Sequence, residues 1–298
     1  MISEASDQVV FAWWNTSLAP SAKSRSTPEQ RAVACSVIMH LIEDSCADFI
    51  ALGEMSIEDF QHVSDNCKVE GYVFVSEITS VGKSSFDICY AYNSNKIMIY
   101  ATKDVTSRNG RSTLKVAKKL DMIVVNSTSL FHVYVSHWPS RLWCHRHDAD
   151  RHVLGIRLRD SINSILEQEG ASPLVVLLGD YNDEPFDESL SQQLMASRDV
   201  DLVQKRQHLL YNPFWKYLCK AKSENPSAGS YYYKSGEITR WHTFDQVIFS
   251  HAFIEAKEWR LANNCNHIVE IPAYTQLVKK SSSKFDHLPV YGIVEKVN

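Results

Sequence analysis

Six apolar runs of the sequence each carry, at or just beyond one end, a side chain that can bind a metal ion or transfer a proton. Such short apolar runs are typical of buried strands. A single Asn, Glu or His at a strand end is usually a cap or a solvated residue, but six together predict a site where several strand ends meet. The residues are Asn15, Glu54, His137, the pair Asp180 and Asn182, Asp245, and the pair Asp286 and His287.

The stretch LLGDYNDEP, residues 177–185, turns abruptly from apolar to acidic. If the strand continues through it, alternate residues point to the same side, and Asp180 and Asn182 are expected side by side. Gly179 would then leave room for a ligand such as a metal-bound phosphate. Taken alone, the stretch is explained better as a turn, because Gly, Asp and Asn are ordinary turn residues.

Composition limits the class of protein. The 298 residues are 44% hydrophobic and 22% charged, close to the norm for a globular chain, and no linker or repeat divides them, so a single domain over 1–298 is expected. The formal net charge of −4 excludes a protein that holds nucleic acid by bulk positive charge alone. It does not exclude a metal-using enzyme, because bound cations offset an acidic cluster.

The cysteine content and the hydropathy of the sequence indicate the cellular compartment. Seven cysteines without a Cys-x-x-Cys pair predict neither a disulfide framework nor a zinc ribbon, and favour reduced thiols. The N-terminal stretch MISEASDQVVFAWWN lacks the basic segment and long apolar run of a signal peptide. No apolar run approaches the roughly 18 residues of a membrane span. We therefore expect a cytoplasmic chain with no membrane span.

Strand and helix signals form two groups along the chain. Thr27, Pro28 and Gln30 form a capping-box start to a helix, and a long helix is expected from about His147 to Glu169, with Gly170 as its stop. A further helix is predicted over 187–199 and an irregular loop over 212–230. Strands are predicted over 9–15, 48–54, 173–180, 230–234, 243–250 and 288–297, and in a middle meander with an Asn109-Gly110 hairpin.

Strict alternation of strand and helix is absent, which argues against a doubly wound parallel sheet. The pattern instead predicts the α+β class, with two mixed, mainly antiparallel sheets packed face to face and helices covering the outside.

The order of the motifs WWN, LGE, SHWPSR, LLGDYND, FDQVIFS and FDHLPV resembles the endonuclease/exonuclease/phosphatase superfamily. These are metal-dependent phosphodiesterases and phosphatases similar to deoxyribonuclease I. The resemblance spans residues 9–294, and GDYN, FDQ and DHLPV in this order are its most specific pieces. It implies the four-layer α/β/β/α sandwich of deoxyribonuclease I and a hydrolase that acts on phosphate ester bonds.

Carried over residue by residue, the resemblance implies a metal site. Glu54 matches the family's principal metal-ligand carboxylate, Asp286 matches a further carboxylate near the metal, and Asn15 would contact the metal or the phosphate. Asp180 matches the carboxylate that positions or activates the attacking water, and it is also expected among the metal-binding residues. Asn182 would hydrogen-bond a phosphoryl oxygen. A hard ion, Mg²⁺ or Mn²⁺, suits such oxygen ligands.

The resemblance also implies two catalytic histidines. His287 matches the family histidine that is paired with a carboxylate, and Asp245 stands in the partner position, where an acid fixes the tautomer and tunes proton transfer. His137 matches a second histidine that stabilises the phosphorane or protonates the leaving oxygen. The acid that supports this second histidine in deoxyribonuclease I has no convincing equivalent here, and Asp87 is only a weak candidate.

Basic and aromatic residues near these motifs allow alternatives. Arg141 and Arg146 are interpreted either as phosphate contacts or as solvated residues at a helix end, and the histidines around them lack the spacing of a zinc site. The basic residues between Lys103 and Lys119 either follow a nucleic-acid backbone or, as we favour, form a solvated hairpin. The tyrosines 231–233 either stack on bases or, again favoured, pack in the core.

We therefore predict a metal-dependent phosphodiesterase, first of all a nuclease that hydrolyses DNA or RNA, with no obligate protein partner. A phosphoinositide phosphatase or sphingomyelinase-like enzyme would share every catalytic residue, but signals for binding a membrane surface are missing from the sequence. A catalytically inactive binding module of the same fold is the third hypothesis. Retention of a crowded set of acids argues against it, because burying them together is costly.

Overall fold

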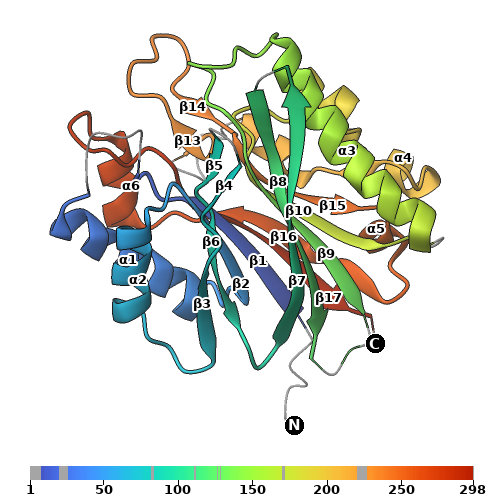
Figure 1. The fold of residues 1–298 in the computed structure, drawn as a ribbon, viewed down its shortest axis with the longest axis horizontal. Helices are drawn as coiled ribbons and strands as arrows, with labels where there is room; N and C mark the ends of the chain where they lie inside the picture. Colours follow the sequence, from blue (N-terminus) through green and yellow to red (C-terminus); the bar gives the residue numbers. More distant parts are fainter. Residues whose placement is uncertain are drawn as a thin grey trace.

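Two sheets lie face to face with helices on both outer sides, as the computed structural model of the chain shows (Figure 1). The structure describes residues 8–19, 26–81, 84–110, 112–125, 127, 129–169, 172–219 and 227–297. The four-layer α/β/β/α arrangement confirms the predicted α+β fold class.

The first sheet has six strands in the order β16-β17-β1-β2-β6-β3. Only β1 and β2 run parallel to each other in it, and their neighbours are antiparallel. The strands are β16 (Trp259–Ile268), β17 (Val290–Lys296), β1 (Gln8–Asn15), β2 (Phe49–Gly53), β6 (Cys89–Asn93) and β3 (Tyr72–Ser76).

The second sheet has seven strands in the order β11-β12-β15-β10-β9-β8-β7. Two small pairs stand outside the large sheets: β13 (Tyr231–Tyr232) with β14 (Trp241–His242), and β4 (Thr79–Val81) with β5 (Ser84–Phe86). The seven strands are β11 (Ala196–Ser197), β12 (Leu210–Tyr211), β15 (Asp245–Ser250), β10 (Leu174–Asp180), β9 (Leu130–His137), β8 (Ser112–Val124) and β7 (Ile97–Asn109).

Three hydrophobic layers hold the sandwich together. One lies between the sheets, one between the first sheet and the helices α1 (Pro28–Glu43), α2 (Ile57–Asn66) and α6 (Pro272–Lys279), and one between the second sheet and α3 (Ala149–Glu169). Strand β1 contributes to two of them: Phe11 and Trp13 face the other sheet, while Ala12 and Trp14 face the helices. A strand buried on both faces is apolar throughout, which explains its unbroken hydrophobic run.

Local signals for helices and turns are confirmed. Thr27 caps α1 with a full capping box, in which its hydroxyl accepts from the backbone of Gln30 and the Gln30 side chain accepts from the backbone of Thr27. The long helix α3 begins at Ala149, two residues after its expected start, and the Gly170 stop lies outside the described residues. The Asn109-Gly110 signal marks the turn between β7 and β8.

Two expectations are wrong. The strands predicted in the middle of the chain do not form one meander, because β6 belongs to the first sheet and β7 to the second, so the chain crosses between the sheets at residues 94–96. Residues 187–199 do not form a helix: a five-residue π-helical turn, Ser189–Gln193, is followed by β11. The next α-helix, α4, begins at Val200 and ends at Lys205.

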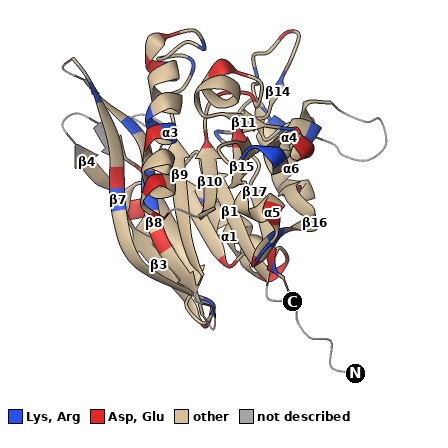
Figure 2. Cartoon of the chain, turned by 90° about the vertical axis from the view of Figure 1, so that its right-hand side faces the viewer, with Lys and Arg blue, Asp and Glu red and all other residues tan. Residues whose placement is uncertain are grey.

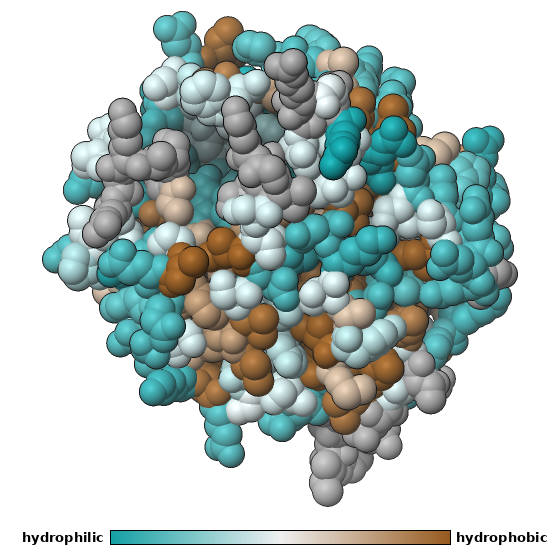
Figure 3. All heavy atoms as spheres, in the orientation of Figure 1, coloured by the Kyte–Doolittle hydropathy of each residue, from teal (hydrophilic) through white to brown (hydrophobic). Residues whose placement is uncertain are grey.

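Loops and outer edges complete the structure. The expected irregular loop begins with a 3-10 turn, Pro213–Leu218, and the short helix α5 (Ala252–Glu255) follows β15. On the face shown in Figure 3, hydrophobic residues gather in the lower half. Strands β3 and β7 each form one edge of a large sheet, and Val73, Met98 and Tyr100 on these strands are exposed.

Gly179 serves the packing of two strands rather than the approach of a ligand. Strand β10 pairs in parallel with β9, with Gly179 opposite Ser136. A Cβ atom on Gly179 would lie 1.9 Å from the carbonyl oxygen of Ser136, far inside van der Waals contact. The neighbouring backbone fills the room that the sequence suggested for a ligand.

We predict that Gly179→Ala destabilises the protein by about 3 kcal/mol or more, because overpacking at a backbone contact cannot be relieved by a side-chain movement. The measurement is the free energy of unfolding in urea. Gly110→Ala is the control: its Cβ would meet nothing within 4 Å, and its φ of +56° limits the expected loss to about 1 kcal/mol. Equal losses in both variants would contradict the packing role of Gly179.

Candidate active site

The register of neighbouring strands brings the predicted residues to one place. In the second sheet, Asp180 at the end of β10 pairs with His137 at the end of β9 and with Asp245 at the start of β15. In the first sheet, Asn15 at the end of β1 pairs with Gly53, and Glu54 follows directly. The strands of each parallel pair, β1–β2 and β9–β10, end at the same edge of their own sheet. The hydrogen bond from Asn15 to Asp180 shows that these two edges lie together.

His287 and Asp245 form a buried pair. The imidazole Nδ1 donates to Asp245 Oδ2 at 2.8 Å, and the other carboxylate oxygen of Asp245 accepts the indole N–H of Trp13 at 2.7 Å. Both oxygens are therefore occupied, and the carboxylate has no exposed surface. Burial alone would lower the pKa of His287, but the charges of Asp245 and Asp180 outweigh it and raise the pKa to about 10.

Asp180 lies at the centre of the cluster. Its Oδ2 is 3.8 Å from His287 Nε2 and accepts from the Asn15 amide at 3.2 Å, while its Oδ1 accepts the backbone N–H of Asn182 at 2.8 Å. Burial and the charge of Asp245 raise the pKa of Asp180 above its ordinary value. A buried carboxylate with a raised pKa beside a histidine is suited to accept a proton.

The second histidine also has its own acid. His137 Nδ1 lies 3.1 Å from Asp87 Oδ1, and its Nε2 lies 3.9 Å from Glu54 Oε1. Burial lowers the pKa of His137, but the Asp87 charge and hydrogen bond outweigh burial and raise it to about 9. Burial likewise raises the pKa of Asp87, yet His137 and Lys115 hold it well below its usual range.

Asp87 is thus the acid that sequence reasoning identified only weakly. It follows β5 directly, and Ile88 separates it from β6. One signal was available: Asp87, Asp245 and Asp286 each follow a phenylalanine, at 86, 244 and 285. These three phenylalanines are all buried, so each anchors the position of the acid that follows it.

Carboxylates that could bind a metal lie on the first-sheet side. Asn15 donates its amide to Glu54 Oε1 at 3.1 Å, and the hydroxyl of Ser17 donates to Asp286 Oδ1 at 2.8 Å. Burial raises the pKa of Glu54, and Asp286 adds to this rise, while His137 and His287 oppose it. Converging, half-buried carboxylates of this kind suit a hard divalent cation with oxygen ligands.

Asn15 presents its amide nitrogen, not its oxygen, to the acids. Its Oδ1 accepts the backbone N–H of Ser17 at 3.1 Å. This orientation suits the positioning of Glu54 and Asp180, and the metal-ligand role predicted for Asn15 would require the amide to turn over.

Asp180, Asp245 and His287 form another group whose ligand atoms lie within 4.8 Å of one another. Three side chains arranged in this way can in principle hold a metal ion. Here, however, the Nδ1 atom of His287 and both oxygens of Asp245 are already hydrogen-bonded within the protein. The arrangement therefore suits proton transfer better than metal binding.

Backbone strain collects around these residues. Among the described residues, six non-glycine residues have a positive φ, and Ser17, Glu54 and Asn182 account for three of them, each at +52°. Such conformations cost roughly 1–3 kcal/mol each and persist where the surroundings impose them. At Glu54, Ala19 N–H and the Thr16 hydroxyl both donate to the backbone carbonyl, which holds it in place.

Asn182 lies near Asp180 for a different reason from the one expected. The strand ends at Asp180, and Asn182 turns back in a left-handed conformation, so alternation along an extended chain does not apply. Its side-chain amide donates to the Trp138 carbonyl at 3.0 Å. The pair is held by a turn, which the Gly, Asp and Asn composition also predicted.

Arg141 and Arg146 both contact Asp187. Arg141 donates to the Asn182 carbonyl at 2.8 Å and bonds Asp187, while Arg146 pairs with Asp187 at 2.8 Å. A shared acid neutralises part of their charge and fixes the loop after β9 against the loop after β10. Their role as phosphate contacts stays a prediction.

The basic hairpin of β7 and β8 is largely balanced by acids. Lys115 pairs with Asp87, Lys118 with Asp104, and Lys119 with Asp121. Figure 2 shows both signs of charge along these strands rather than a continuous basic stripe. This favours the solvated hairpin over a track for a nucleic-acid backbone.

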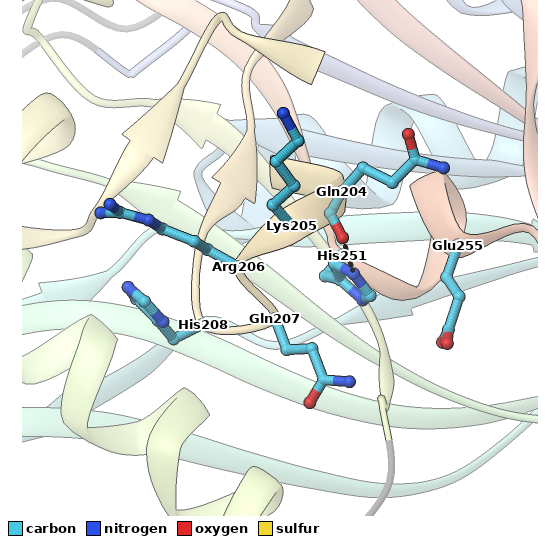
Figure 4. A pocket seen from close by; sticks show the side chains of 7 residues that line it. All are labelled: Gln204, Lys205, Arg206, Gln207, His208, His251 and Glu255. Atoms are coloured by element: carbon cyan, nitrogen blue, oxygen red, sulfur yellow. Dashed lines mark hydrogen bonds between the residues drawn. The ribbon is translucent and has the colours of Figure 1, made fainter. Parts of the chain in front are cut away.

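A surface depression of about 590 Å³ lies away from the cluster, between α4 and α5 (Figure 4). His251, which follows β15, donates from its Nε2 to the Gln204 carbonyl at 3.1 Å. It lies at the opposite end of β15 from Asp245, roughly 20 Å away along an extended strand. Lys205 and Arg206 extend in different directions rather than converging, so this depression is no part of the site.

Comparison with known proteins agrees with the geometry. The model of the Endonuclease/Exonuclease/phosphatase family matches residues 23–294. No curated protein matches the chain by sequence.

Among solved structures, the human Nocturnin catalytic domain with bound sulfate anion is 15% identical (TM-score 0.62; 98% of this chain and 96% of that one). Truncated Caenorhabditis elegans TDP2 is also 15% identical (TM-score 0.60; 97% and 98%). D. rerio TDP2 complexed with single strand DNA product is 12% identical (TM-score 0.58; 97% and 99%). These structures share the fold.

We predict that the contribution of the Asp87–His137 pair to stability falls as pH rises. The folded pKa of His137, about 9, exceeds its unfolded value near 6.5, so the contribution is complete below about pH 6.5 and is lost through about pH 9. In chelator, Asp87→Asn should cost on the order of 2–3 kcal/mol at pH 6 and much less at pH 10, measured by urea unfolding. Asp65→Asn on exposed α2 is the control, and a pH-independent cost of Asp87→Asn would contradict the pairing.

Proposed function

The chain belongs to the endonuclease/exonuclease/phosphatase family, and from this premise we propose that it is a metal-dependent phosphodiesterase that hydrolyses nucleic-acid phosphodiester bonds. Enzymes of this family typically hydrolyse phosphate esters. The observation that carries the proposal is a pair of histidines, each bonded to its own acid, on either side of Asp180 and facing Glu54. Phosphoryl displacement needs this combination of charge stabilisation and proton transfer.

A divalent metal, Mg²⁺ or Mn²⁺, fits Glu54 and Asp286, with Asp180 close by, and would polarise the phosphate as a Lewis acid. Asp180, whose pKa is raised by burial, would orient the attacking water and accept its proton. Asn182 would hydrogen-bond a phosphoryl oxygen.

The two histidines would act as cations. Because the pKa of His287 is raised to about 10 and that of His137 to about 9, both are protonated near neutral pH. His287, fixed by Asp245, would stabilise the negative charge on the phosphorane. His137, fixed by Asp87, would donate its proton to the leaving oxygen.

One observation favours a second candidate, an enzyme that acts on lipid phosphoesters. Large apolar side chains are exposed in the loop after β9 and in the β13–β14 hairpin, namely Leu142 at 78%, Trp143 at 85%, and Ile238, which is fully exposed. Exposed apolar tips can insert into a membrane surface. This signal is not visible in the sequence, because the two loops are far apart along the chain.

No helix in the described part of the chain is long and apolar enough to cross a bilayer. We also propose that the protein is cytoplasmic, that residues 1–298 form a single domain, and that it needs no obligate protein partner. The inactive binding module is disfavoured, because the acids and histidines are held in one hydrogen-bonded arrangement.

The test is hydrolysis of supercoiled plasmid, of single-stranded RNA, and of phosphoinositide or sphingomyelin vesicles, each in Mg²⁺, in Mn²⁺ and in chelator. We expect metal-dependent cleavage of nucleic acid, a loss of roughly 10²- to 10⁴-fold in His287→Ala, and a weakened metal dependence in Glu54→Gln.

The matched control is His208→Ala, which removes an exposed histidine in the depression between α4 and α5 and should leave turnover unchanged. Near-native turnover in a folded His287→Ala protein would remove that residue from the mechanism. Hydrolysis of vesicles alone would replace the nuclease proposal with the lipid candidate.

A further inference from the structure

A cavity of about 250 Å³ opens directly beside the candidate active site. Its walls come from the loop after β9, the turn after β10 and the β13–β14 hairpin, which stands above this end of the sheets in Figure 1. The side chains that form it include Arg141, Asn182, Tyr231, Tyr233, His242 and Phe244. Its volume is below the ~300–1,000 Å³ of most small-molecule sites, which suits one ring system of a larger substrate.

Two residues that line the cavity also contact candidate catalytic residues. The ring of Tyr231 lies 4.7 Å from the imidazole of His287, and the two residues also form a backbone bridge. Asn182 lines the cavity and donates its backbone N–H to Asp180. A group that fills the cavity is therefore adjacent to a phosphate held at His287 and Asp180.

The cavity is walled by a preformed aromatic stack. The Tyr231 and Phe244 rings are 5.3 Å apart at an interplanar angle of 15°, and the His242 and Phe244 rings are 4.9 Å apart at 23°. The Arg141 guanidinium lies 4.6 Å from the centre of the Phe244 ring. Flat aromatic faces and an arginine plane are the surfaces on which proteins stack nucleobases.

Hydrogen bonds fix the polar groups of the cavity. His242 Nδ1 is bonded to Glu184 at 2.9 Å, and the other Glu184 oxygen accepts the backbone N–H of Thr243 at 2.9 Å. With Nδ1 held in this way, Nε2 is left to bond a ligand. Tyr233 is 42% exposed, so it can pack against a ligand without displacing core residues.

Charge argues against a phosphorylated sugar as the occupant. A polyphosphate headgroup needs several available cations, whereas Arg141, the cation that lines the cavity, already pairs with Asp183 and Asp187. A flat, neutral ring with polar edges matches both the stack and the single available imidazole nitrogen.

Resting on the phosphodiesterase activity proposed above, we propose that this cavity is a base-binding pocket that seats the nucleobase of one nucleotide flanking the scissile phosphate. Tyr233 and His242 contact the base, and the Tyr231–Phe244 stack supports them. Single-stranded nucleic acid is then the preferred substrate, because a base must be unpaired to enter the pocket.

The test uses four dinucleoside monophosphates with one scissile phosphodiester: thymidylyl-thymidine, the two analogues that lack one base, and the analogue that lacks both. kcat/KM is measured in Mg²⁺ for the native protein, Tyr233→Ala, His242→Ala and Trp143→Ala. Trp143 is the matched control, because it is 85% exposed in the same loop as Arg141 but does not line the cavity.

We expect removal of the base on one side, and not on the other, to lower kcat/KM of the native protein roughly 5- to 100-fold. Tyr233→Ala and His242→Ala should bring this ratio toward one, while Trp143→Ala retains it. Rescue of the ratio by Tyr233→Phe would confirm stacking as its source.

Each other outcome counts against the pocket. An unchanged ratio in folded Tyr233→Ala and His242→Ala proteins overturns it, and so does equal hydrolysis of all four substrates. Hydrolysis of phosphoinositide or sphingomyelin vesicles without hydrolysis of any dinucleotide also overturns it and assigns Leu142 and Trp143 to a membrane surface. If no phosphodiester is hydrolysed in any metal, the phosphodiesterase proposal itself fails, and the pocket fails with it.

Discussion

Burial of several carboxylates at the seam between two sheets is the constraint on which the rest of the structure depends. Asp180 and Asp245 are almost fully buried next to each other, and burial, together with the charge of Asp245, raises the pKa of Asp180. Two histidines with raised pKa values, His137 and His287, compensate this charge. The indole N–H of Trp13 and the amide of Asn15 donate hydrogen bonds to the same acids. The groups that would carry out the chemistry are thus also the groups that make the buried acids tolerable.

The sandwich could be predicted because its elements have strong local signals. Apolar runs that end in polar residues identified the central strands, and the capping box at Thr27 identified α1. The failures lie where partners decide the outcome. The runs at 89–93 and 97–109 look alike as strands, and nothing local shows that one joins each sheet. Residues 187–199 have helical spacing, but they do not form the predicted helix because their partners lie elsewhere. Asp187 forms ion pairs with Arg141 and Arg146, and the Ser189 hydroxyl donates to Asp183.

The site could be predicted to the level of residue type and approximate place. His137, Asp180 and Asp245 converge because strand register aligns their positions. Glu54 follows β2 directly, and His287 joins them from the segment that leads into β17. The partner of His137 was not firmly assigned, because Asp87 reaches it from the two-residue connection between β5, in a small strand pair, and β6, rather than from a strand of the sheet that carries His137. Arg141 looked available in the sequence, and only the fold shows the acids that engage it.

The contacts of the candidate site join residues that are very distant along the chain. Trp13 bonds Asp245 across 232 positions, and Ser17 bonds Asp286 across 269. His287 is placed by the segment that leads into β17, which pairs with β1. Closing such large loops is slow, because chain entropy is lost before the contacts form and stabilise the fold. The candidate site is therefore assembled only when β1 has paired with β17 and the segments around Asp245 and His287 have docked beside it. Its formation is a late event of folding rather than a property of any one local segment.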